Sequence, residues 1–294
     1  MKTFQEAIRT QDFTLSAELR LDSHSDAAAI MEQARILALA VDAIQVTDNP
    51  SGRVHLSPLI AAGVLLDNGI DPVLHMTCRD RNRIALRSDL LGAAVLGVTS
   101  LLLMRGDNIA EKPLPHAGTV FDWRAKGLIA AANLLRSDPP FAKPVNFHIG
   151  SIATAFNPDR DWKPEKIKAK VDAGTNFIQT QLCFDIDLLR RYMARLVSEK
   201  LIERVDVIVG TAPVPSVEVA RWLRKNLRGA VMPRRMVKRL RQSTKPKREG
   251  ELICAEILHE AAQIPGVSGA NLMSFGDAES IVEAVESSGV RQKY

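Results

Sequence analysis

Short aliphatic runs alternate with segments of helical spacing along most of the chain. Eight such runs predict strands, at 13–19, 42–46, 72–76, 100–104, 144–149, 176–180, 205–209 and 270–274. Apolar residues recur every three or four positions between them, which predicts helices at 26–40, 56–66, 81–96, 123–135, 164–173, 185–197, 216–227 and 278–287. Eight strand-then-helix units favour an α/β protein with a single (β/α)8 barrel over a doubly wound sheet.

The boundaries of the repeat support the same fold. Residues typical of helix starts and exits lie where the pattern needs them: Pro164, Ser216, Gly97 and Gly174. Residues 1–9 are expected to form a short helix that covers the bottom of the barrel, and the long connection between the last two strands leaves room for extra helices at 233–241 and 249–262. No interdomain linker is evident, so 1–294 is interpreted as one barrel domain.

The predicted strands end on polar side chains. In a (β/α)8 barrel the ligand site is built at the carboxyl ends of the strands. Those ends carry Glu18, Thr47, Asp48, His75, Thr77, Arg105, Asp107, Gln181, Thr211 and Ser274, with Phe156 in the fifth loop. The clearest example is the run 100–108, in which Arg105-Gly106-Asp107 follows an aliphatic strand. The same tripeptide serves as an adhesion ligand on secreted proteins, but nothing else here indicates secretion.

Composition narrows the class of protein. Apolar residues make up 46% of the chain but aromatic residues only 5%, so the core must be aliphatic. The amino-terminal segment lacks the apolar stretch of a signal peptide, and no segment has the roughly 18 uninterrupted apolar residues of a membrane span. We therefore expect a cytoplasmic protein that does not associate with membranes.

Cysteine spacing and charge exclude further classes. Cys78, Cys183 and Cys254 lie far apart, which argues against a disulfide framework or a zinc site, so no metal is expected. The net charge of +5 is concentrated in 234–248, which lacks the stacking aromatic residues of a nucleic-acid site. This stretch is interpreted as a solvated helix and linker, with attraction of an anionic ligand as the alternative.

Six motifs, taken in order, resemble the methylenetetrahydrofolate reductase family. They are 16–18 (SAE), 46–48 (VTD), 74–80 (LHMTCRD), 103–107 (LMRGD), 170–174 (KVDAG) and 180–185 (TQLCFD). The resemblance implies a (β/α)8 barrel that binds FAD and folate at the carboxyl ends of its strands. In that family NAD(P)H reduces FAD, and a hydride then passes to 5,10-methylenetetrahydrofolate to give 5-methyltetrahydrofolate. Folate and nicotinamide are the implied partners, and a homo-oligomer is left open.

The resemblance also implies residue roles. Glu18 would be the general acid, because a carboxyl at a barrel mouth is partly desolvated and its pKa is raised. Asp107 would meet both flavin and pterin. The other implied cofactor contacts are Thr47, His75, Arg105, Gly106, Phe156 and Lys170; the other implied substrate contacts are Gln181 and Val217.

Each of these residues has a structural alternative. Glu18 would be a surface carboxylate that ends a strand, and Arg105 and Asp107 would form a salt bridge with each other. Gln181 would cap a backbone group, His75 would be structural, and Lys170 would be solvated.

The likeness weakens after about residue 217 and departs from the family at four places. The family's diproline and lysine after the acid are replaced by 19–22 (LRLD), and its adenine-stacking tyrosine by Phe156. Val217 stands where the family has a phenylalanine against the folate or nicotinamide, and 276–277 (GD) stand in place of Asn-Arg. The flavin face therefore matches better than the substrate face. A reductase without flavin and a non-catalytic folate-binding barrel are the alternatives.

Overall fold

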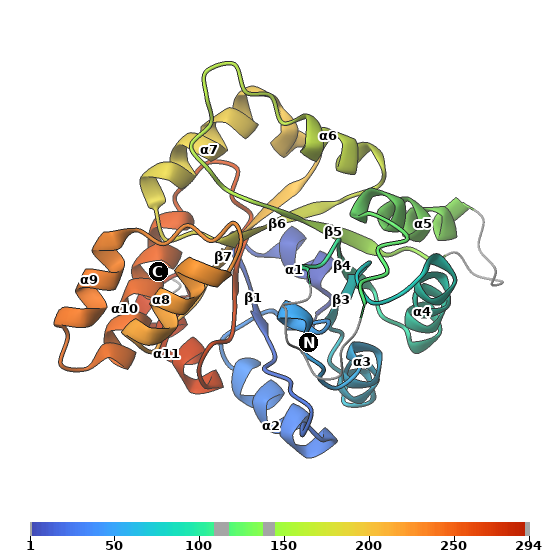
Figure 1. Cartoon of the computed structure of the whole chain (residues 1–294), viewed down its shortest axis with the longest axis horizontal. Coiled ribbons are helices and arrows are strands. Elements are labelled where there is room, and N and C mark those ends of the chain that lie inside the picture. The colour runs from blue at the N-terminus through green and yellow to red at the C-terminus, as the bar shows by residue number, and fades with distance from the viewer. Residues whose placement is uncertain (1, 109–117, 138–144, 292–294) are drawn as a thin grey trace.

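Eight parallel strands close into a barrel in chain order (Figure 1). The computed structural model describes residues 2–108, 118–137 and 145–291. The strands are β1 (Thr14–Glu18), β2 (Ala43–Val46), β3 (Val73–Thr77), β4 (Ser100–Met104), β5 (His148–Ala153), β6 (Phe177–Leu182), β7 (Asp206–Thr211) and β8 (Gly269–Leu272). Because β1 pairs with both β2 and β8, the sheet has no free edge. The predicted (β/α)8 barrel is confirmed.

Helices surround the barrel between successive strands (Figure 1). They are α2 (Ala27–Leu37), α3 (Pro58–Asp67), α4 (Arg83–Leu96), α5 (Ala125–Ser137), α6 (Glu165–Asp172), α7 (Ile186–Ser198), α8 (Val217–Asn226) and α11 (Ala278–Ser288). The expected extra helices are α9 (Arg234–Gln242) and α10 (Pro246–Ala261), and short 3-10 turns lie at Pro50–Gly52 and Leu201–Glu203. Ser216 caps α8 as predicted, since its hydroxyl accepts from the Val219 backbone N–H at 3.2 Å.

The amino-terminal helix α1 (Phe4–Thr10) closes the end of the barrel opposite the site. The Phe4 ring packs against the rings of His148 and Phe177, with centroids 6.1 and 5.1 Å away. Phe4 also belongs to an apolar cluster with residues near the amino ends of the strands, such as Ala43 and Val73. The expected bottom cover is confirmed for residues 4–10; residue 1 lies outside the described residues.

The fifth strand differs from its prediction. It was expected at 144–149 but runs over His148–Ala153, four residues later at its end; residue 144 lies outside the described residues. The predicted strand ends at Ile149, before Gly150 and Ser151. Gly150 instead belongs to the strand because the Phe177 ring occupies the place of its missing side chain.

The basic stretch forms an ion-paired surface helix. In α9 the side chains of Met236, Val237 and Leu240 are buried. Arg239 pairs with Glu249 and Glu256 of α10, in each case with an N–O distance of 2.6 Å. The interpretation of 234–248 as a solvated helix therefore holds for α9.

No helix within the described residues combines the length and the apolar character that a membrane span requires.

We expect Gly150→Ala to destabilise the fold. A Cβ at this position would lie 2.1 Å from the Cζ of Phe177, whose ring is held between Phe4 and His148. Overpacking of this kind costs about 1–3 kcal/mol of the free energy of unfolding, measurable by urea denaturation. Gly92→Ala in α4 is the matched control, because nothing lies within 4 Å of its Cβ position. An equal stability of the two variants would contradict the packing explanation.

Candidate active site

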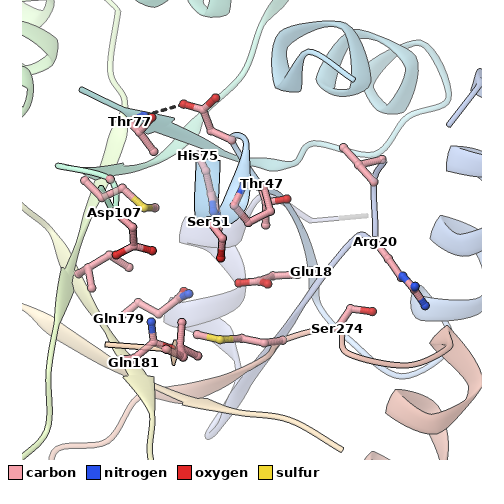
Figure 2. A pocket seen from close by; sticks show the side chains of 18 of the residues that line it. Glu18, Arg20, Thr47, Ser51, His75, Thr77, Asp107, Gln179, Gln181 and Ser274 are labelled. Carbon is pink, nitrogen blue, oxygen red and sulfur yellow. Dashed lines mark hydrogen bonds between the residues drawn. The ribbon is translucent and has the colours of Figure 1, made fainter. Parts of the chain in front are cut away.

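The carboxyl ends of the strands surround a cavity of about 240 Å³ (Figure 2). Six of the predicted site residues line it: Glu18, Thr47, His75, Gly106, Asp107 and Gln181. They come from β1, β3, β6 and the loops that follow β2 and β4. Residues far apart in the sequence therefore face one space, as expected for a barrel site.

Glu18 ends β1 between two buried neighbours, Ala17 and Leu19. Desolvation raises the pKa of its carboxyl from the ordinary 4.5 to about 7. The Asn271 side chain opposes that shift by donating from Nδ2 to Oε1 at 3.3 Å. The carboxyl is therefore about half protonated near neutrality and can serve as a proton donor.

His75 lies on the cavity wall as a neutral ring. Burial lowers the pKa of its imidazole to about 3. Its Nε2 lies 2.7 Å from Oε1 of Gln45, a buried residue inside the barrel. His75 therefore contributes hydrogen bonding to the site and no charge.

Gly106 lets the loop after β4 approach the loop after β3. Its φ is +82°, and a Cβ there would lie 3.0 Å from the Cβ of Thr77. The conformation and the space therefore both favour glycine. The turn places Asp107 on the cavity wall (Figure 2).

Arg105 is directed elsewhere. Its guanidinium stacks on the Phe121 ring, 3.8 Å from the centroid, and donates to Oδ1 of Asn108 at 3.2 Å. No ion pair joins it to Asp107 within the part of the chain that the structure describes. Arg105 does not line the cavity.

Phe156 and Lys170 line a second cavity, of about 500 Å³, which adjoins the first at Ile152. The Phe156 ring meets Trp162 edge-on, with centroids 5.0 Å apart. The Lys170 Nζ donates to the backbone oxygen of Ile152 at 2.5 Å, and burial lowers the pKa of this amine. Phe156 and Lys170 thus lie apart from the six residues of the first cavity, in a second cavity that shares Ile152 with it.

Val217 lies outside both cavities. It is the first residue of α8 and packs in an apolar cluster with Leu182 and Phe184. Aromatic contact with the cavity comes instead from Trp222, further along the same helix, and from Phe275 after β8. The sequence pattern did not identify either residue, because which face of α8 meets the barrel depends on long-range packing.

Asp48 and Arg79, to which the sequence assigns no individual role, hold together the loops at the mouth of the site. Asp48 accepts from the Thr77 backbone N–H at 2.7 Å and pairs with Arg81. Arg79 is 1% exposed yet lines the cavity, and its guanidinium donates to Asp80 and to the backbone oxygen of Asn49. These contacts fix the loops after β2 and β3 relative to each other.

The three thiols are buried and free of disulfides. Burial raises the pKa of Cys78 and Cys183 to about 11 and that of Cys254 to about 12, so all three stay protonated. No cluster of metal-binding side chains occurs within residues 2–108, 118–137 and 145–291.

The family model for methylenetetrahydrofolate reductase matches residues 3–289. The chain belongs to this family. A probable methylenetetrahydrofolate reductase (NADPH) from Caenorhabditis elegans is 27% identical over 143 residues, which is 48% of this chain and 20% of that protein. Methylenetetrahydrofolate reductase 1 from Schizosaccharomyces pombe is 26% identical over 136 residues, 45% of this chain and 21% of that protein. The matches thus span about a fifth of these relatives.

Solved structures show the same fold as this methylenetetrahydrofolate reductase family member. An uncharacterized protein from Clostridium thermocellum, described as binding two copies of 5-methyl-5,6,7,8-tetrahydrofolic acid, has a TM-score of 0.65 at 13% identity, covering 97% of this chain and 96% of that one. Yersinia pestis DHPS with a pterine-sulfa conjugate has a TM-score of 0.51 at 12% identity, with 95% and 94% covered. At these identities the likeness establishes the fold.

We expect Glu18 to lower the stability of this family member as the pH rises from 4.5 to about 7. The folded state holds the Glu18 proton in that range while the unfolded state releases it, so the free energy of unfolding falls with pH and levels off above 7. A pKa shift of this size corresponds to roughly 3 kcal/mol at most. Urea denaturation of the wild type and of Glu18→Gln across this range measures the difference. Parallel curves would show that the Glu18 pKa is not raised.

Proposed function

We propose that this chain reduces 5,10-methylenetetrahydrofolate to 5-methyltetrahydrofolate, with FAD as cofactor and NAD(P)H as electron donor. The observation that carries the proposal is the Glu18 carboxyl, poised near neutrality in the same cavity as Asp107 and Gln181. Family membership supports it. The folate bound by the Clostridium thermocellum protein, which is the product of this reaction, agrees with it.

Glu18 would act on the substrate's five-membered ring. Proton transfer from the carboxyl to the leaving N10 opens this ring and leaves an iminium carbon at N5, which then accepts a hydride. The hydride derives from NAD(P)H, and the carboxylate regains its proton from solvent. One molecule of substrate, one NAD(P)H and one proton thus give 5-methyltetrahydrofolate and NAD(P)+.

Asp107 and Gln181 would orient the pterin. A carboxylate accepts paired hydrogen bonds, which suits the N–H groups along a pterin edge. The Gln181 Oε1 accepts from the Leu182 backbone N–H at 2.9 Å, which leaves its Nε2 to donate to a ligand. Trp222 and Phe275 offer the aromatic contact that Val217 does not.

The two cavities, which share Ile152 in their walls, carry residues that suit FAD. Phe156 and Trp162 offer faces and edges for a flat base, and Lys170 brings a positive charge to that space. Thr47, His75 and Gly106 lie on the wall of the first cavity, where the flavin ring would be held. FAD, when bound, supplies the hydride relay between nicotinamide and substrate. Arg105 lines neither cavity, so it would contact FAD only at the edge of the site.

We expect Glu18→Gln to abolish reduction of methylenetetrahydrofolate while leaving reduction of the flavin by NADH largely intact. The amide cannot supply the proton, but it preserves the size of the side chain. Anaerobic stopped-flow absorbance measures the two half-reactions separately. Equal loss of both would show that Glu18 is not the substrate's acid.

We expect the purified protein to bind FAD, and the flavin absorption band to bleach with NADH and return with methylenetetrahydrofolate. Folate reduction without any flavin band or FAD binding would favour direct hydride transfer from the nicotinamide. Folate binding with neither half-reaction would favour a non-catalytic barrel.

Phe156→Ala should weaken FAD binding up to roughly tenfold, because it removes a stacking surface in the second cavity. Fluorescence titration measures the affinity. Leu134→Ala is the control, since Leu134 is exposed on α5 and lines neither cavity of the site. An unchanged Kd in Phe156→Ala would place the base elsewhere.

A further inference from the structure

Gln45 organises the floor of the cavity from inside the barrel. It is fully buried on β2, and its Nε2 donates to the Ser16 hydroxyl and to Oε1 of Gln179, both at 2.8 Å. Since both amide hydrogens are used, its Oε1 must face a donor, and that donor is the Nε2–H of His75 at 2.7 Å. In this arrangement Gln45 donates to Ser16 and Gln179 and accepts from His75.

This arrangement orients the Gln179 side chain. Gln179 lies on β6, is 1% exposed and lines the cavity that contains Glu18 and Asp107. Its Oε1 is occupied by Gln45, so its Nε2 is the end left for the cavity (Figure 2). Flipping the Gln179 amide alone would set two N–H donors against each other. Gln179 is thus held as a donor.

The Nε2 of Gln179 has no hydrogen-bond partner among the described residues. A buried donor without an acceptor costs free energy, which a ligand atom placed beside it recovers. Asp107, on the same cavity, offers only acceptor oxygens. A ligand that satisfies both Gln179 and Asp107 must carry hydrogen-bond acceptors and donors on one small, rigid ring system.

We propose that Gln179 is a further substrate-binding residue, whose Nε2 donates a hydrogen bond to a ring nitrogen or carbonyl oxygen of the substrate's pterin. This inference rests on the proposed function. A pterin carries N–H donors for Asp107 and acceptors for Gln179 on the same ring system. With its Oε1 bonded to Gln45, Gln179 selects for an acceptor at this place and disfavours a ligand with a donor there.

Two substitutions test the donor. Gln179→Met preserves the length of the side chain and removes the amide, whereas Gln179→Glu keeps the oxygen for Gln45 and replaces the NH2 group. We expect each to weaken binding of 5-methyltetrahydrofolate roughly tenfold in isothermal titration calorimetry, with the Kd for FAD unchanged. Thermal unfolding of each variant confirms that it is folded. If one variant does not fold, the other still tests the inference.

Ser151→Ala is the matched control. Ser151 lies on the neighbouring β5, is fully buried and lines neither cavity of the site. Like the Nε2 of Gln179, its hydroxyl has no hydrogen-bond partner among the described residues. Wild-type folate affinity in both Gln179 variants would overturn the inference, as would an equal loss in Ser151→Ala. Weaker FAD binding with unchanged folate binding would assign the donor to the cofactor and also overturn it. A wild type that binds no folate would instead refute the proposed function.

Discussion

Closing an eight-stranded sheet on itself directs side chains from every strand into one shared interior, where each polar group must find its partner across the barrel. The bond between Gln45 on β2 and Gln179 on β6 shows this constraint directly. From Gln45, hydrogen bonds run to His75 and, through Ser16, to Asn271 and Glu18. The chemistry at the mouth thus rests on a polar layer that only the closed barrel can assemble.

The fold was largely predictable because each strand and helix of a (β/α)8 barrel produces a pattern in its own stretch of sequence. Aliphatic runs marked all eight strands, and residues such as Ser216 marked the start of a helix. The exception is β5, whose position depends on Gly150 receiving the ring of Phe177, a residue of the next strand. No local pattern carries that information.

The site was predictable where a side chain ends a strand, as Glu18 and His75 do. Residues within the strands were missed, although a signal existed for one of them. Side chains two positions apart in a strand share a face, so Gln181 at the mouth points to Gln179 one layer deeper. For Trp222 no such signal exists, because which side of α8 meets the cavity is set by tertiary packing.

The side chain that hydrogen-bonds to the Glu18 carboxyl lies 253 positions later in the sequence, at Asn271 of β8. During synthesis Glu18 leaves the ribosome 253 residues before Asn271 of β8. Until β8 pairs with it, β1 has an open edge, and the Glu18 carboxyl lacks the complete burial that raises its pKa. The acid of this site is therefore a property that a nascent chain does not possess, and it arises in the same event that closes the barrel.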